Sequence, residues 1–311
     1  MKPKIYAKSA LKTNQAKAKL AIGYDALEIQ LLNEIVIDRP KSIYRPYKEV
    51  FDIEQFARVY KVDIVHAPLL PGSGDTLLEA VIDKNDLPLL RQVFDIAQTF
   101  ANIQGHDVGI VIHSESYYYK LMDEDVWPEL VEQLSQLLRE YSRVYLLIEN
   151  VSPLRDIGKS GKQMHFANNA TFDNVEMVKN LREAIGTNRI YTCLDICHAM
   201  LADKYISILY NAVGDVTKLD LSMEQYFIEN KDVIGLIHLS DIKGSGYGRG
   251  RHGIPFYEET YDKLCGILDL YVKHDYKCPI TLEVEEEDYN ICTGYATTKK
   301  LVDRYFENLN K

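Results

Sequence analysis

Eight short apolar runs, rich in β-branched residues, recur along this chain of 311 residues. Longer amphipathic segments separate them, and this alternation predicts parallel strands joined by helical crossovers. Apolar and polar residues do not alternate within the runs, which is typical of a parallel sheet covered on both faces. Eight strands are the number that closes a (β/α)8 TIM barrel, so we predict this α/β fold. The predicted strands are Lys4–Ala7, Ala26–Leu32, Val62–His66, Val108–His113, Val144–Glu149, Ile190–Asp195, Val233–His238 and Ile280–Val284.

Several segments between these runs have the period of an amphipathic helix. In the clearest of them, Leu89, Val93 and Ile96 recur close to every 3.6 residues. The predicted helices are Asp86–Ala101, Val126–Glu140, Phe172–Ile185 and Tyr257–Val272, with Thr171 as the N-cap of the third. Residues 204–227 show no regular period, and no structure is predicted for them. Because no linker rich in proline, glycine or serine divides the chain, we expect a single barrel domain over residues 1–311.

The composition limits the classes of protein to which the chain can belong. No apolar stretch approaches the roughly 20 residues that span a bilayer, so no membrane segment is expected. The five cysteines are an odd number without the paired spacing of a zinc ribbon, which favours a soluble protein in a reducing cytoplasm. The net charge of −10 argues against a broad basic surface for nucleic acid, although it allows a local positive patch.

The runs end in residues that bind metal ions or protons. Six of the eight do so, and a further histidine, His198, follows the sixth run by three residues. The carboxyl ends of barrel strands meet at one mouth, so these side chains are expected to lie together. Burying so many ionisable groups without a metal would be costly, whereas imidazoles and carboxylates suit Zn²⁺ or Mn²⁺. The terminal residues are His66, His113, Glu149, Asp195, His238 and Glu283.

Four short motifs at these positions resemble those of the endonuclease IV / xylose isomerase-like barrel superfamily, and the resemblance covers nearly the whole chain. The motifs stand in the order of that superfamily, although each is weak alone. They are His66-Ala-Pro, Glu149-Asn150, Asp195-Ile-Cys-His198 and His238-Leu-Ser-Asp241-Ile-Lys243.

The resemblance implies one to three divalent ions. In the nucleases of the superfamily, a first ion would have His66, His113 and Glu149 as ligands, and a second would have Glu149, Asp195, His238 and Glu283. A third would need His198 together with an Asp-Arg-His motif. Here that motif reads Gly250-Arg251-His252, so the third ion loses its only carboxylate ligand. The sugar isomerases and epimerases of the superfamily need only the second set.

Two enzymatic functions follow from the resemblance, and we rank phosphodiester hydrolysis at abasic sites in DNA slightly ahead. The additional histidines support it, as does a glycine-rich cationic loop that could hold a phosphate. The expected phosphate-binding residues of that loop are Lys243, Arg249 and Arg251. The missing aspartate and the acidic net charge oppose it.

The alternative is isomerisation or epimerisation of a sugar or sugar phosphate. Glu149 and Glu283 would then remove a proton from carbon and return it. A barrel that only binds a ligand is a third possibility, which the nearly complete ligand set disfavours. The oligomeric state is not predicted.

Overall fold

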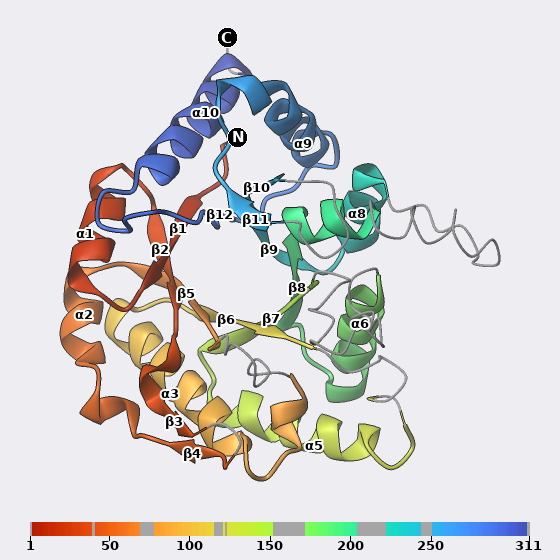
Figure 1. Cartoon of the computed structure of the whole chain (residues 1–311). Coiled ribbons are helices and arrows are strands. Elements are labelled where there is room, and N and C mark those ends of the chain that lie inside the picture. The colour runs from red at the N-terminus through yellow and green to blue at the C-terminus, as the bar shows by residue number, and fades with distance from the viewer. Residues whose placement is uncertain are drawn as a thin grey trace, which may run out of the picture.

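Eight parallel strands close into a barrel in the computed structural model, which describes residues 2–38, 41–68, 78–114, 121, 123–151, 172–203, 222–243 and 251–309 (Figure 1). Around the barrel the strand order is β1-β12-β9-β8-β7-β6-β5-β2. The predicted (β/α)8 barrel is confirmed, and every predicted strand overlaps an observed one. The barrel strands are β1 (Ile5–Ala10), β2 (Ala26–Gln30), β5 (Val62–His66), β6 (Val108–His113), β7 (Val144–Glu149), β8 (Ile190–Asp195), β9 (Ile234–Leu239) and β12 (Ile280–Leu282).

Helices surround the barrel in Figure 1. The four predicted helices are present as α3, α5, α6 and α9, while the predicted N-cap Thr171 and most of residues 204–227 lie outside the described residues. The helices are α1 (Thr13–Ala21), α2 (Ile53–Val59), α3 (Leu87–Gln104), α5 (Trp127–Glu140), α6 (Asp173–Ile185), α8 (Met223–Asn230), α9 (Tyr261–Lys273) and α10 (Thr293–Leu309). The short 3-10 turns are η1 (Asn33–Ile35), η2 (Tyr47–Glu49), η3 (Leu78–Val81) and η5 (Glu258–Thr260).

Two small antiparallel ribbons accompany the barrel. One consists of β3 (Val36–Asp38) and β4 (Ile43–Tyr44), and the other of β10 (Asp241–Lys243) and β11 (Arg251–Ile254). None of the helices in the described part of the chain is long and apolar enough to cross a membrane.

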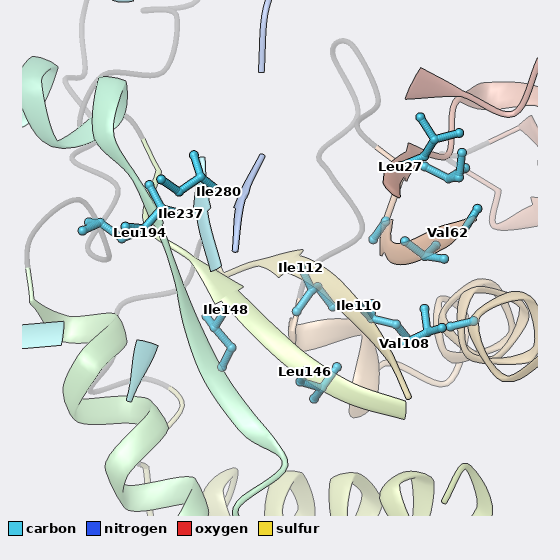
Figure 2. Close-up of a cluster of buried hydrophobic side chains, with 14 of the residues drawn as sticks. Leu27, Val62, Val108, Ile110, Ile112, Leu146, Ile148, Leu194, Ile237 and Ile280 are labelled. Atoms are coloured by element: carbon cyan, nitrogen blue, oxygen red, sulfur yellow. The ribbon is translucent and has the colours of Figure 1, made fainter. Parts of the chain in front are cut away.

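The hydrophobic core has two layers, because successive side chains of a strand point to opposite faces. The outward-facing residues of the strands join the main core, as Figure 2 shows for Leu27, Ile110 and Leu146. A smaller cluster fills the inside of the barrel and consists of Tyr6, Ala26, Ile64, Val111, Leu147, Cys193 and Leu236.

The interior layer determines where a site can form. Each interior residue of β5, β6, β7, β8 and β9 is followed two positions later by a predicted site residue, so the site residues form the next layer toward the carboxyl ends. Below them the barrel is tightly filled. A Cβ atom on Gly235 would lie 2.6 Å from Leu147 and 2.7 Å from the Cβ of Tyr191. The open end is therefore the one that carries the histidines and carboxylates.

Candidate metal centre

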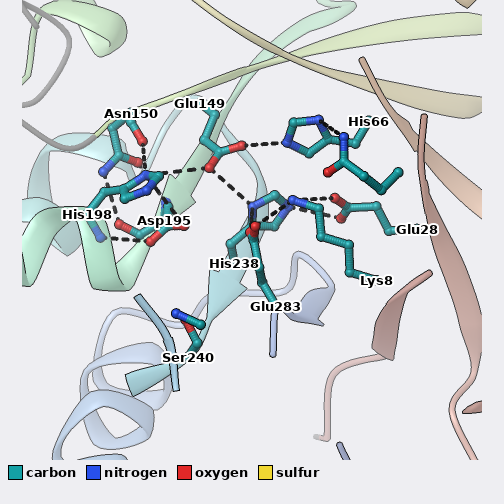
Figure 3. A network of polar contacts seen from close by, with 12 residues as sticks. Lys8, Glu28, His66, Glu149, Asn150, Asp195, His198, His238, Ser240 and Glu283 are labelled. Carbon is teal, nitrogen blue, oxygen red and sulfur yellow. Dashed lines mark hydrogen bonds and ion pairs between the residues drawn. The ribbon is translucent and has the colours of Figure 1, made fainter. Parts of the chain in front are cut away.

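The six side chains that were predicted at the ends of barrel strands meet at the carboxyl-terminal mouth of the barrel, each at or within one residue of the end of its observed strand. Figure 3 shows them converging, apart from His113, with His198 from the segment after β8 beside them. All six are buried except Glu283, which is half-buried. The predicted convergence is therefore present in the structure, and it groups the residues into overlapping sets.

The largest set consists of Glu149, Asp195, His238 and Glu283. Each residue offers one ligand atom, and these atoms all lie within 4.8 Å of one another. The Nδ1 atom of His238 lies 2.8 Å from Oε2 of Glu283 and 3.4 Å from Oε1 of Glu149. The structure thus brings together the four residues that the sugar isomerase resemblance implies.

Glu149 also belongs to a second set with His66 and His113. Its Oε2 atom lies 3.2 Å from Nε2 of each histidine, while its Oε1 atom faces His238. The rings of His66 and His113 are 5.4 Å apart and nearly perpendicular. One carboxylate that presents its two oxygens to different ligand sets has the arrangement of a bridge between two ions.

His198 and His252 form a third and weaker set, with ring centroids 5.3 Å apart. Among the described residues their companion is the thiol of Cys197, with ligand atoms within 4.8 Å of one another. The sequence analysis assigned no ligand role to Cys197. Burial raises the pKa of this thiol well above its ordinary value, and the charge of Asp195 raises it further.

Two residues that the sequence analysis missed, Lys8 and Glu28, support the largest set from β1 and β2. Oε2 of Glu28 accepts a hydrogen bond of 2.9 Å from Nε2 of His238. The ammonium of Lys8 donates to Oε1 of Glu283 at 2.6 Å and lies 3.7 Å from Oε1 of Glu28. These residues are paired across β1 and β2, and both are buried.

Asn150 fixes the neighbouring ligand. Its side chain accepts a hydrogen bond of 2.7 Å from the backbone N–H of Asp195 and donates one of 3.0 Å to the carbonyl of the same residue. Its own carbonyl accepts a hydrogen bond of 2.8 Å from Nδ1 of His198. The Glu-Asn motif therefore supplies both a ligand atom and the support for another ligand.

The histidines share one property that bears on metal binding. Each of three uses one ring nitrogen to donate to a protein oxygen: His66 to the carbonyl of Ala67, His198 to that of Asn150, and His238 to Glu28. The second nitrogen then carries a lone pair in the neutral ring. In His66 and His238 this nitrogen faces carboxylate oxygens, and such an arrangement is favourable only with a proton or a cation between the groups.

The pKa values of the groups around His238 also indicate that a positive charge belongs between His238 and the carboxylates. Burial would raise the pKa of Glu149, but His238 and His113 hold it well below its ordinary value, and Lys8 and His238 do the same for Glu283. Burial would lower the pKa of His238, but Cys193 and the surrounding carboxylates raise it well above its ordinary value.

Buried polar atoms that make no hydrogen bond show whether the site would suit a divalent cation. Among the described residues, Nδ1 of His238 and Oε2 of Glu283 are buried and make no hydrogen bond, although they lie close together. Four buried or half-buried carboxylates, Glu28, Glu149, Asp195 and Glu283, surround His238 and its neighbours, and the ammonium of Lys8 forms ion pairs with two of them, Glu28 and Glu283. Because unpaired buried charge is costly, the residues present fit a divalent cation.

The predicted phosphate-binding residues are only partly described. Lys243 ends β10, is exposed and pairs in register with Arg251 of β11. Arg249 lies outside the described residues, and only the backbone of Arg251 is described. Their role in binding phosphate stays a prediction.

A cavity of about 430 Å³ opens beside the metal centre. Lys8, Glu283 and His252 of the metal centre and its surroundings line it, together with Lys12, Lys19 and Tyr289. Pockets of this size commonly hold small molecules.

Comparison with known proteins agrees with this geometry. The family model described as xylose isomerase-like TIM barrel matches residues 18–305. A comparison with curated proteins gives no match.

Solved structures resemble the chain over nearly its full length. The 3-keto-D-glucoside 4-epimerase YcjR from E. coli is 14% identical, covers 97% of this chain and 100% of its own, and has a TM-score of 0.53. A structure of L-ribulose 3-epimerase is 13% identical, with coverage of 99% and 96% and a TM-score of 0.56. An AP endonuclease of family 2 from Brucella melitensis is 14% identical, with coverage of 95% and 98% and a TM-score of 0.52. At such identities the likeness shows the fold. On the strength of the family match over most of its length, the chain belongs to the xylose isomerase-like TIM barrel family.

Proposed function

We propose that this protein is a divalent-metal-dependent isomerase or epimerase that acts on a sugar. The observation that carries the proposal is the set formed by Glu149, Asp195, His238 and Glu283 at the barrel mouth, beside a cavity of the size of a small molecule. The similar structures support it, since two of the three named above are sugar epimerases. This reverses the order of the two functions in the sequence analysis, which ranked hydrolysis first.

In the proposed reaction the two glutamates act as an acid and base pair. Glu149 and Glu283 both lie beside His238, so their carboxylates stand close together at the barrel mouth, where one substrate carbon could come within reach of both. Their lowered pKa values keep them ionised, which is the state that accepts a proton from carbon. A bound Zn²⁺ or Mn²⁺ would polarise the substrate carbonyl. Lys8 holds Glu283, and Asn150 holds the backbone of Asp195, so both groups are oriented before substrate binds.

Exchange of substrate hydrogen with solvent tests the proposal without knowledge of the product. The protein, loaded with Mn²⁺ or Zn²⁺, is incubated in D₂O with a panel of pentoses and hexoses in their keto and aldo forms. We expect deuterium to enter a carbon next to the carbonyl of at least one sugar, as followed by proton NMR. The exchange rate should fall by a factor of about 100 to 10,000 in Glu149→Gln and in Glu283→Gln. Absence of exchange across the panel, in protein shown to bind the ion, would overturn the proposal.

Phosphodiester hydrolysis at abasic DNA remains a second candidate because of one observation. The set of His66, His113 and Glu149 could hold a further ion that a single-metal isomerase does not need. One of the similar structures is an AP endonuclease of family 2. Incubation with an oligonucleotide that contains an abasic site tests this candidate, and no incision at micromolar protein with Zn²⁺ or Mn²⁺ would remove it.

A further inference from the structure

Helix α1 and its N-cap residue Lys12 line the same cavity as Glu283 of the metal centre. Lys12, Gln15 and Lys19 line the cavity, and their spacing of three, four and seven residues places them on the same side of a helix. Lys12 is exposed at the start of the helix, whereas Lys19 is fully buried in its last turn. The side chain of a helical residue leans toward the amino terminus of the helix, so Lys19 reaches back toward the barrel mouth.

The ammonium of Lys19 has an unusual environment for a buried charge. Among the described residues it makes no hydrogen bond and no ion pair. It lies 4.6 Å from the ring centroid of Tyr295 and 5.3 Å from that of Tyr289. These two rings offer cation–π contacts, which replace only part of the hydration that the charge has lost.

Gln15 and Lys12 provide two further donors beside the cavity. Oε1 of Gln15 accepts from the backbone N–H of Ala10 at 3.2 Å, so the amide NH₂ group is the end of this side chain that can donate. Within the described part of the chain, Lys12 has no carboxylate partner either. Of the nearby acids, Oε1 of Glu286 accepts from the backbone N–H of Tyr295 at 2.8 Å, and Glu285 also lines the cavity.

We propose that the end of the cavity formed by Lys12, Gln15 and Lys19 binds an anionic group of the substrate, either a phosphate or a carboxylate. Lys12, Gln15 and Lys19 all line this part of the cavity, and an anion held there would give Lys19 the partner that it lacks among the described residues. The other end of the cavity is lined by Glu283 and Lys8, so a substrate of this kind would place its uncharged end at the metal centre. That the anion belongs to the substrate rests on the proposed function, whereas the anion site itself does not.

The burial of Lys19 is consistent with such a site. Burial lowers the pKa of its ammonium to about 8, although Cys292 and Glu286 act in the opposite direction. A bound anion would favour the charged form, so ligand binding and protonation of this lysine would support each other.

Calorimetric titration with inorganic phosphate and with glycolate tests the site. We expect measurable binding to the wild-type protein, a loss of affinity of about tenfold or more in Lys12→Met and in Lys19→Met, and no change in Lys17→Met, an exposed lysine of the same helix. Tighter binding of phosphate would indicate a sugar phosphate, and tighter binding of glycolate would indicate a sugar acid. Because Lys12 is exposed, Lys12→Met keeps the test valid even if Lys19→Met folds poorly.

The same titration in Glu149→Gln separates this site from the metal centre. We expect the anion to bind this variant with unchanged affinity, whether or not the protein catalyses hydrogen exchange. Anion binding that Glu149→Gln abolishes and the two lysine variants retain would overturn the proposal. So would an absence of binding to the wild-type protein, or an equal loss in Lys17→Met.

Discussion

Replacing Glu28 by glutamine is expected to weaken metal binding although this residue is not in the proposed ligand set. The carboxylate of Glu28 accepts the hydrogen from Nε2 of His238 at 2.9 Å, and this bond leaves Nδ1 free to face Glu149 and Glu283. Glutamine has the same shape and can still accept this hydrogen, but without the negative charge that makes the imidazole a stronger ligand.

The expected loss of metal affinity depends on which partners of Glu28 each substitution removes. Loss of an outer partner of a metal-ligating histidine typically weakens metal affinity by about 10- to 100-fold, or about 1.4 to 2.8 kcal/mol. For Glu28→Gln we expect the lower end of that range, because a neutral hydrogen bond remains. For Glu28→Leu we expect the upper end, since Nε2 of His238 and the buried ammonium of Lys8 both lose a partner.

Competition between the protein and a chelator for Mn²⁺ measures this effect. Asp63→Asn is the matched control, because Asp63 is also a buried carboxylate on a barrel strand with a histidine and a tyrosine as partners, 3.1 Å and 2.6 Å away. It lies near the amino-terminal end of β5, away from the metal centre. Asp63→Asn should lower stability and leave metal affinity unchanged. Unchanged Mn²⁺ affinity in Glu28→Leu, or an equal loss in Asp63→Asn, would refute the reasoning.

Three further predictions test other parts of the structure. In a titration with Zn²⁺, His113→Ala should remove one bound ion per chain and leave the affinity of the remaining ion within about threefold, since His113 approaches Oε2 of the bridging Glu149, whereas Oε1 is the oxygen that faces His238. Gly235→Ala should lower the free energy of unfolding by about 1 to 3 kcal/mol in urea denaturation, because the added methyl would overlap Leu147 and Tyr191. As a control, Gly266→Ala in α9 should raise the free energy of unfolding slightly, because a methyl group at this position meets no other atom. The pKa of Lys19 is lowered by burial from 10.5 to about 8, so the native state binds this proton less well than the unfolded state does. The resulting penalty of about 3 kcal/mol acts in full below pH 8 and disappears as the pH rises toward 10.5. Lys19→Met should therefore be more stable than the wild-type protein at pH 7, and a difference that does not shrink between pH 8 and 10.5 would contradict this assignment.

The sequence was sufficient to predict the barrel and the six side chains that meet at its mouth. Both depend on local patterns: apolar runs define the strands, and the residue that ends each run points into the mouth. The supporting residues could not be found in this way. Lys8 lies one residue beyond the predicted end of its strand, and Glu28 lies in the middle of another, so neither ends a run. Only the closed topology, which pairs β1 with both β2 and β12, brings them to His238 and Glu283.

The lysines of α1 escaped prediction for a different reason. The sequence of this helix is polar, and a lysine in such a helix is normally exposed. Lys19 is buried because α10 packs Tyr295 against it and the preceding segment adds Tyr289, both more than 260 residues away in the chain. Cys197, which lies with His198 and His252, could not be predicted from the sequence either. Its spacing does not distinguish a possible metal ligand from a thiol that only packs in the core.

The number of bound ions bears on the choice between sugar isomerisation and phosphodiester hydrolysis. This number depends on Glu149 more than on Gly250, which stands in place of the aspartate of the Asp-Arg-His motif. Nδ1 of His66 donates to the carbonyl of Ala67 at 2.8 Å, so the neutral ring turns an unprotonated Nε2 toward Oε2 of Glu149. A lone pair and a carboxylate oxygen only 3.2 Å apart repel each other unless a positive charge lies close to both. Burial and the charge of Lys8 lower the pKa of His66, so a proton is a poor candidate for that charge. A second ion between His66, His113 and Glu149 meets this requirement directly. We therefore expect two ions in the fully loaded protein, and hydrogen exchange at carbon in that state would show that the second ion does not by itself commit the site to hydrolysis.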